Sequence, residues 1–272
     1  MLRIWPAQGA TKAALVYLHG IEGHSSWFAD TAQYLASGGV TTRAVDRRGS
    51  GLSKERRGDA ASFTRLLQDV EEVIDDAIAK EGDVPVFLMA NCWGAKLAAL
   101  VSRKQSRVAS KLAGLVLSSP AVAVKVDLPF KAKLEIALRC CLGSLKPLPI
   151  PLLPENFTDN PQFLSMIAED KLRLTEATSR FFVAGFLLTL MSGKASPQIE
   201  MPILIVQSGI DDIVDIEGVE RWFSLAASPD KTMELFSGAR HSLDFHKEPA
   251  HYRATLLQWL LSRAALSRRG AA

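Results

Sequence analysis

The sequence lacks the features that mark disulfide-rich, membrane-spanning or nucleic-acid-binding proteins. Its 272 residues include three cysteines, Cys92, Cys140 and Cys141, which have neither the even number of a disulfide framework nor a zinc-binding spacing. No apolar run approaches the ~20 residues that span a bilayer. The net charge of +3 balances 32 basic against 29 acidic residues, too little to attract nucleic acid or an anionic membrane. We therefore expect no metal, no cofactor, no nucleic-acid partner and no transmembrane segment.

The first residues also lack a secretory signal. Between Met1 and Leu18 the only apolar run is the segment from Ala13 to Leu18, and it is shorter than the apolar core of a signal peptide, which has roughly 7–15 residues. Cysteines without a disulfide pattern are typical of a reducing compartment. We therefore expect a cytoplasmic protein.

What the sequence does have is an alternation of short apolar segments with longer helical patterns. This alternation is typical of a parallel sheet covered by helices, and it predicts one doubly wound α/β protein. A helix capped by Ser62 is expected up to Gly82, because its apolar residues recur at helical spacing. The other expected helices are 93–105, 216–227 and 249–263, and the expected strands are 14–18, 40–45, 84–89, 112–117, 202–207 and 232–236.

The alternation stops at Pro120 and resumes near Met201. The interruption holds its own helical patterns and a group of prolines, and an insertion of this kind predicts a lid over the carboxyl ends of the strands. Residues 1–119 and 201–272 would then form the core and 120–200 the helical lid. Residues 181–191 are apolar on every side, which predicts burial beneath or within the lid. A lid that dips into a membrane is the alternative.

The segment from Val86 to Ala99 runs from an apolar strand through one sharp turn into a helix. Such a turn strains its central residue, Cys92, and requires small residues two places before and after it, here Ala90 and Gly94. A helix N-terminus and a nearby imidazole favour the reactive thiolate form of a cysteine. We therefore expect Cys92 to be a nucleophile, and an inert buried cysteine is the alternative.

This turn resembles the nucleophile elbow of the α/β-hydrolase fold, with Ala90 in place of the first glycine of G-x-S-x-G and Cys92 in place of the serine. The stretch from Asp46 to Ser53 is similar to the D-x-R-G-x-G-x-S stretch of the lysophospholipase and monoacylglycerol-lipase-like, serine aminopeptidase-like branch. It suits a tight turn in which Asp46 and Arg48 tie loops together without a catalytic role.

The resemblance assigns an oxyanion hole to the loop that follows the first parallel strand. In this family, His-Gly at that strand end shapes a loop whose next N–H joins the N–H after the nucleophile, which implies Ile21 and Trp93 as donors. His19 would then be a structural residue of the loop and not the base. His24 would line the mouth of the site or lie exposed to solvent.

The acid and the base follow in the family's order of nucleophile, acid and histidine. The loop from Ser208 to Asp215 is similar to the family's acid loop and implies Asp211 as the acid, with Asp212 as the alternative. His241 occupies the place of the catalytic histidine, which Asp211 would orient toward Cys92. The sequence departs from the family in Cys92 and in a short opening that leaves room for one strand near residues 2–6.

These motifs predict an enzyme that works on acyl groups through a Cys-His-Asp triad and an acyl-Cys92 intermediate. A thiol exchanges acyl groups readily with thioesters, which favours a thioesterase or acyltransferase on a small acyl substrate, including one carried by coenzyme A or acyl carrier protein. Carboxylester hydrolysis of the lysophospholipase-like kind is the alternative. A hydrolase-fold protein that only binds an apolar ligand is a third interpretation, against which the retention of Asp211 and His241 argues.

Overall fold

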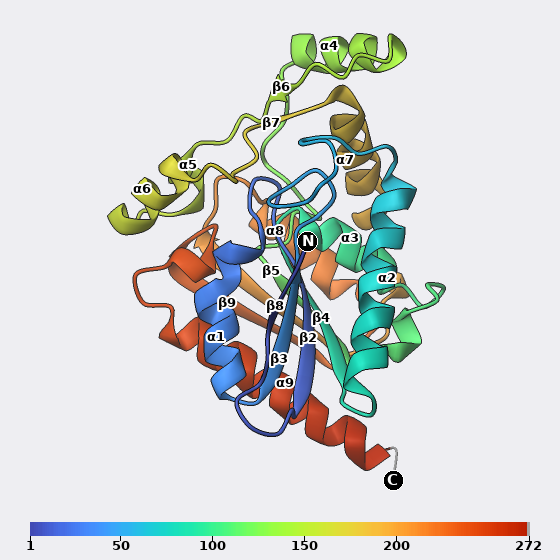
Figure 1. The fold of residues 1–272 in the computed structure, drawn as a ribbon, viewed down its shortest axis with the longest axis vertical. Helices are drawn as coiled ribbons and strands as arrows, with labels where there is room; N and C mark the ends of the chain where they lie inside the picture. The colour runs from blue at the N-terminus through green and yellow to red at the C-terminus, as the bar shows by residue number, and fades with distance from the viewer. Residues whose placement is uncertain (271–272) are drawn as a thin grey trace.

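The computed structural model of the chain describes residues 1–270, and the side chains of residues 1–267. A seven-stranded sheet in the order β1-β3-β2-β4-β5-β8-β9 forms its centre (Figure 1). Only β1 runs antiparallel to its neighbour, and the other neighbouring pairs are parallel. The strands are β1 (Leu2–Trp5), β2 (Ala13–Leu18), β3 (Val40–Val45), β4 (Val86–Asn91), β5 (Gly114–Ser118), β8 (Ile203–Ile210) and β9 (Lys231–Arg240). The predicted mostly parallel sheet is confirmed, including the single short strand at the opening.

Helices cover both faces of the sheet, and each face has its own core. One core joins the sheet to α2 (Phe63–Glu81), α3 (Gly94–Val101) and α8 (Ile216–Ser224), and the other joins it to α1 (Ala29–Ser37) and α9 (Ala250–Gly270). β2, β4 and β5 are buried along their whole length, and burial on both faces explains why most of their residues are apolar. Short 3-10 helices lie at Ser25–Phe28, Ala109–Lys111, Ser196–Gln198 and Leu243–Phe245.

The α2 helix forms as its sequence pattern predicts. The Ser62 side chain accepts a hydrogen bond from the Arg65 N–H at 3.1 Å, and Gly82 ends the helix with a φ of 61°. Its buried residues, Leu66, Val70, Ile74 and Ala77, lie three or four positions apart and face the sheet.

Most elements differ from the expected bounds by a few residues at their ends, and α3, β9 and α9 differ most. The α3 helix ends at Val101 instead of 105, where the chain turns so that the Lys104 N–H donates to the Gln198 carbonyl oxygen. The β9 strand continues to Arg240, past the expected residue 236, because an irregularity in the pairing lets Arg240 lie opposite Ile210. The α9 helix runs on to Gly270, since the residues after 263 are helix formers without a breaker before that glycine.

The chain between β5 and β8 contains four helices and a two-stranded antiparallel sheet. The helices are α4 (Phe130–Cys141), α5 (Pro154–Phe157), α6 (Pro161–Glu169) and α7 (Ser179–Ser192), and the strands are β6 (Leu148–Pro149) and β7 (Glu176–Ala177). Figure 1 shows these elements gathered beyond one end of the main sheet, whereas α1, α2 and α9 flank its faces. Over residues 1–270, no helix is long and apolar enough to cross a membrane.

The α7 helix corrects one expectation, because it is buried along one side only. Phe181, Ala184 and Leu188 are buried, whereas Phe186 is 62% exposed and Leu190 is 51% exposed. The uniformly apolar sequence of α7 therefore does not mean that every side of the helix is buried. The α4 helix packs against α7 outside the main core, and its only buried residue is Ile136.

Candidate active site

The turn between β4 and α3 holds Cys92 in a left-handed backbone conformation. Its φ is 50°, a value that few residues other than glycine adopt, and the predicted strain is therefore present. The neighbouring strand end holds this conformation, because the Cys92 N–H donates to the Ser118 carbonyl oxygen at 3.0 Å. A Cβ on Gly94 would lie 2.7 Å from the His19 carbonyl oxygen, so the turn needs glycine there.

The loop after β2 passes directly against this turn. A Cβ on Gly20 would lie 3.2 Å from the Cys92 Cβ. Inside the loop, the His19 Nδ1 donates to the Gly20 carbonyl oxygen at 2.7 Å, and the Arg47 N–H donates to the His19 Nε2 at 3.0 Å. Burial and the nearby Arg47 charge lower the pKa of His19 to about 3. Both ring nitrogens are engaged and the ring is neutral, so His19 has no free nitrogen to act as a base.

Trp93 follows Cys92 directly in the sequence, and Ile21 lines the same cavity as Cys92 and Trp93. In the described part of the chain, neither the Ile21 N–H nor the Trp93 N–H donates a backbone hydrogen bond outside the regular helices and strands. The carbonyl side of the loop is held by Arg47, whose guanidinium donates to the Gly20 oxygen at 3.2 Å and to the Ile21 oxygen at 3.0 Å. The same guanidinium lies 4.4 Å from the centre of the Trp93 ring. Arg47 therefore contacts both the loop that carries Ile21 and the residue that follows Cys92.

Arg47 is a residue that the sequence reasoning missed. It occupies a variable position of the Asp46–Ser53 motif, next to the arginine that the motif specifies. It is 8% exposed, and burial lowers its pKa to about 9 although the charge of Cys92 opposes this. Nothing in the local pattern distinguishes it from a solvated surface arginine.

The structure brings Asp211 and not Asp212 against His241. The Asp211 Oδ2 lies 2.8 Å from the His241 Nδ1, and both side chains are buried. Asp211 also accepts hydrogen bonds from the Ser208 hydroxyl at 2.6 Å and from the N–H groups of Ile213 and Val214. Asp212 points elsewhere and pairs with Arg240 at 3.0 Å. The fixed carboxylate therefore holds the imidazole in one orientation.

Asp211 and His241 stabilise each other's charged forms. Burial raises the pKa of Asp211, but the His241 charge and the hydrogen bonds outweigh it and lower the pKa to about 2. Burial lowers the pKa of His241, but the charges of Cys92 and Asp211 outweigh it and raise the pKa to about 10. The second ring nitrogen, Nε2, is buried, and His241 and Cys92 line the same small cavity of about 20 Å³.

A larger cavity of about 300 Å³ opens on the other side of Cys92. Its walls come from α3, α7 and the segments between β5 and α5, and most of them are apolar. Three lining residues with polar side chains, Lys96, Asp127 and Thr189, interrupt this surface. The cavity therefore adjoins Cys92 and has the mostly apolar lining that is typical of small-molecule sites. The apolar lining residues include Ile150, Leu152, Phe181, Phe182, Phe186 and Ile213.

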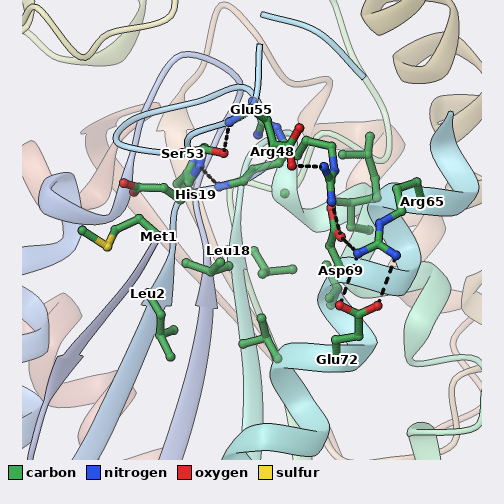
Figure 2. Close-up of a pocket in the computed structure, with 18 of the residues that line it drawn as sticks. Met1, Leu2, Leu18, His19, Arg48, Ser53, Glu55, Arg65, Asp69 and Glu72 are labelled. Carbon is green, nitrogen blue, oxygen red and sulfur yellow. Dashed lines mark hydrogen bonds and ion pairs between the residues drawn. The ribbon is translucent and has the colours of Figure 1, made fainter. Parts of the chain in front are cut away.

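A separate cavity of about 550 Å³ lies beside α2 and is lined by neither Cys92 nor His241. Figure 2 shows that several of its charged groups pair with one another: Arg48 pairs with Asp69 at 2.9 Å and with Glu55 at 2.6 Å, and Arg65 pairs with Asp69 at 2.7 Å. These ion pairs tie the turn after β3 to α2. Asp46 also ties loops together, accepting from the N–H groups of Ser25 and Leu52. The structural role expected of Asp46 and Arg48 is confirmed.

The insertion binds the loop that carries Ile21. The Glu22 carboxylate, which is fully buried, accepts from the Arg173 Nε at 2.7 Å, and the Glu22 carbonyl oxygen accepts from the Leu174 N–H at 2.9 Å. His24 lies 2.8 Å from the Asp170 carboxylate and is buried. His24 therefore neither lines the mouth of the site nor lies exposed, and both sequence-based alternatives for it are wrong. Within residues 1–270, no group of three or more histidine, cysteine, aspartate or glutamate side chains could hold a metal ion.

A comparison with known protein families identifies the family of this chain. The model of the family described as serine aminopeptidase, S33, matches residues 9–249. The chain belongs to this family. As a member of the S33 family it is a hydrolase of the α/β-hydrolase type.

Two individual relatives are similar to this chain along most of its length. Human monoglyceride lipase is 29% identical over 252 residues, which are 90% of this chain and 80% of the human protein. Phospholipase YtpA of Bacillus subtilis is 27% identical over 236 residues, which are 85% of this chain and 88% of that protein.

Solved structures show that this S33 member has the α/β-hydrolase fold. The crystal structure of the Paleococcus ferrophilus monoacylglycerol lipase superposes with a TM-score of 0.84 at 23% identity, covering 97% of this chain and 98% of that chain. A soluble variant of the Saccharomyces cerevisiae monoglyceride lipase, in complex with a substrate analogue, superposes with a TM-score of 0.86 at 16% identity, covering 96% and 91%.

Proposed function

We propose that the protein is a carboxylester hydrolase that cleaves esters of apolar acyl chains and uses Cys92 as its nucleophile. The observation that carries this proposal is the position of Cys92. It lies in a strained turn, with the buried Asp211–His241 pair beside one cavity and an apolar cavity on its other side. This arrangement supplies a nucleophile, an oriented base and an acyl-binding space.

The first half of the reaction would form a thioester on the enzyme. The Cys92 thiolate attacks the ester carbonyl carbon, and the carbonyl π electrons move to the oxygen, where the N–H groups of Ile21 and Trp93 stabilise the negative charge. When the carbonyl reforms, the bond to the alcohol oxygen breaks, and the His241 imidazolium gives its Nε2 proton to that oxygen. Asp211 stabilises the imidazolium up to this step.

The second half would release the acid. His241, now neutral, accepts a proton from a water molecule as the water oxygen attacks the acyl carbon. The same two N–H groups hold the oxyanion, and its collapse breaks the carbon–sulfur bond. Cys92 leaves as a thiolate beside the protonated imidazole, so the starting state is restored.

The relatives favour an ester substrate and water as the acyl acceptor. Two of them are called monoglyceride lipase and phospholipase. This supports lysophospholipase-like ester hydrolysis better than the thioesterase or acyltransferase activity that the sequence favoured, and a lipid ester better than an acyl group carried by coenzyme A or acyl carrier protein. Thioester cleavage is the second candidate, because the thiol of Cys92 and a substrate thioester exchange acyl groups with little change in bond energy. The three free cysteines fit the cytoplasmic setting that we propose.

The test is ester hydrolysis by the purified protein, using 4-nitrophenyl esters and monoacylglycerols of increasing chain length and an acyl thioester of matched length. We expect Cys92→Ala and His241→Ala to lower kcat/KM by about 10³-fold or more. Cys141→Ala is the matched control, since Cys141 is exposed on the insertion and should leave turnover unchanged. Full activity of Cys92→Ala would overturn the proposal, and absence of turnover on every substrate would favour the binding-protein interpretation.

A further inference from the structure

The acyl-binding cavity contains a buried lysine that the proposed reaction does not use. Lys96 lies on the first turn of α3 and lines the same 300 Å³ cavity as Cys92. Its side chain crosses to α7, where its Nζ donates to the Thr189 hydroxyl at 2.7 Å. The residue is 6% exposed, although it occurs in a helix whose other residues are apolar or glycine.

In the part of the chain whose side chains are described, no carboxylate forms an ion pair with the ammonium group of Lys96, and the nearest charge that acts on it is that of Cys92. Among the described residues its one hydrogen-bond acceptor is the neutral Thr189 hydroxyl, and its Nζ also lies 5.9 Å from the centre of the Trp93 ring, so two of its three N–H donors have no hydrogen-bond acceptor there. The other charged residue of the cavity wall, Asp127, pairs with Lys133 and accepts from the Leu128 N–H. Burial lowers the pKa of Lys96 to about 8, and the charge of Cys92 only partly opposes this shift.

An unpaired buried cation is unfavourable for folding. Removing an ammonium group from water costs several kcal/mol unless an anion or several acceptors replace the lost hydration. An apolar side chain of the same length would fill this position without that cost. One hydrogen bond to the neutral Thr189 hydroxyl and a contact with the Trp93 ring replace only part of that lost hydration.

We propose that Lys96 forms a subsite for a carboxylate on the acyl chain of the substrate, so that half-esters of dicarboxylic acids are preferred over esters of simple fatty acids. This proposal rests on the proposed function, since it assumes that the cavity beside Cys92 receives the acyl chain. A cavity of about 300 Å³ holds roughly ten groups of the size of a water molecule, so the chain that reaches from Cys92 to Lys96 would be short.

The test compares two esters of equal acyl length, 4-nitrophenyl hexanoate and the mono-4-nitrophenyl ester of adipic acid. We expect wild-type kcat/KM to favour the adipate ester by about tenfold or more, because a charge-assisted hydrogen bond in a buried site is strong. Lys96→Met should remove this preference, and Lys96→Arg, which keeps the positive charge, should retain most of it. Lys194→Met is the control, since Lys194 is an exposed lysine just after α7 and its loss changes the net charge equally.

A third ester places the carboxylate on the other side of the scissile bond. Because 4-(hexanoyloxy)benzoate carries its charge on the leaving group, the proposal predicts no Lys96-dependent preference for it. A preference for this ester that is lost in Lys96→Met would overturn the acyl-side assignment. Equal kcat/KM values for the hexanoate and adipate esters in the wild type would overturn the subsite. This comparison can be made even if Lys96→Met does not fold.

Binding to the Cys92→Ala protein separates this proposal from the proposed function. Calorimetry would compare monomethyl adipate with methyl hexanoate, each titrated into Cys92→Ala and into the double variant with Lys96→Met. Tighter, Lys96-dependent binding of the adipate ester without turnover by the wild type would support the subsite and reject the hydrolase. If the wild type turns over both esters and neither binding nor rate differs between the adipate and hexanoate esters, the hydrolase is supported and the subsite is rejected.

Discussion

His241 is held between two groups that favour its protonated form. Asp211 is 2.8 Å from its Nδ1, and Cys92 shares the small cavity on its other side. Although burial opposes the charge, Cys92 and Asp211 raise the pKa of His241 to about 10. The resting enzyme would therefore hold the imidazolium that the first half of the reaction needs as its acid.

We predict that His241 titrates far above the ordinary histidine range. In protein labelled with carbon-13 histidine, the Cε1 signal of His241 should remain that of the imidazolium past pH 8, and Cys92→Ala should move its titration to lower pH. The folded pKa exceeds the unfolded value near 6.5, so protonation of His241 stabilises the fold fully below pH 6.5, and this contribution is lost as the pH rises to about 10. A wild-type midpoint near 6.5 would refute the charge pairing.

Arg47 is expected to act on catalysis through the loop after β2, which carries Ile21. Its guanidinium binds the carbonyl oxygens of Gly20 and Ile21, and this fixes the direction of the N–H groups in the same loop. We predict that Arg47→Met lowers kcat about tenfold or more with a smaller change in KM, and that Arg47→Lys restores part of kcat. Arg48→Met is the control, because Arg48 contacts Asp69 and Glu55 and should affect stability without lowering kcat. Equal losses of kcat in both variants would argue against a positioning role.

At the scale of elements, a buried ion pair joins the insertion to the loop after β2, which carries Ile21. Glu22 is fully buried, and burial raises its pKa to about 7 even though Arg173 opposes the shift. Removing one partner of such a pair leaves an uncompensated charge. The position of the insertion and the shape of the loop are therefore coupled through these two side chains.

We predict that Arg173→Met lowers the free energy of unfolding by about 3 kcal/mol, and that adding Glu22→Gln recovers part of the loss. Urea denaturation of the two single variants and the double variant measures the coupling. Arg221→Met is the comparison, since Arg221 pairs with exposed Asp215 and Glu217 and should change stability by less than about 1 kcal/mol. Additive effects of Arg173→Met and Glu22→Gln would show that the pair does not couple the two segments.

The sequence predicts well those elements whose signal is local. The apolar strand and small residues around Cys92 define the elbow, and the spacing of Leu66, Val70 and Ile74 defines α2. The burial of α7 could not be predicted, because a uniformly apolar helix shows no preferred face and only packing selects one. The Glu22–Arg173 pair joins residues 151 positions apart, and no pattern within either segment announces it.

At the scale of the whole molecule, the sheet separates two cores and the candidate site lies at one end of it. The alternation of apolar strands with helices predicts this arrangement, since each parallel strand must be covered on both faces. Family motifs then locate Cys92, Asp211, His241 and the N–H groups of Ile21 and Trp93, and the structure brings these residues together. Arg47 and Lys96 were missed because their roles depend on tertiary burial. A lysine among the small and apolar residues of the helix after Cys92 was the one signal in the sequence that could have indicated Lys96.

The most direct measurement is intact-protein mass spectrometry after rapid acid quenching of the enzyme during turnover of an activated ester. We predict a mass gain of one acyl group, located by peptide mapping at Cys92 and removed by neutral hydroxylamine, which cleaves thioesters and spares oxygen esters. The adduct should be absent in Cys92→Ala and should accumulate more in His241→Ala when the thioester cannot be hydrolysed. Turnover without an adduct on Cys92, or with the adduct on Cys140 or Cys141, would contradict the thiol mechanism.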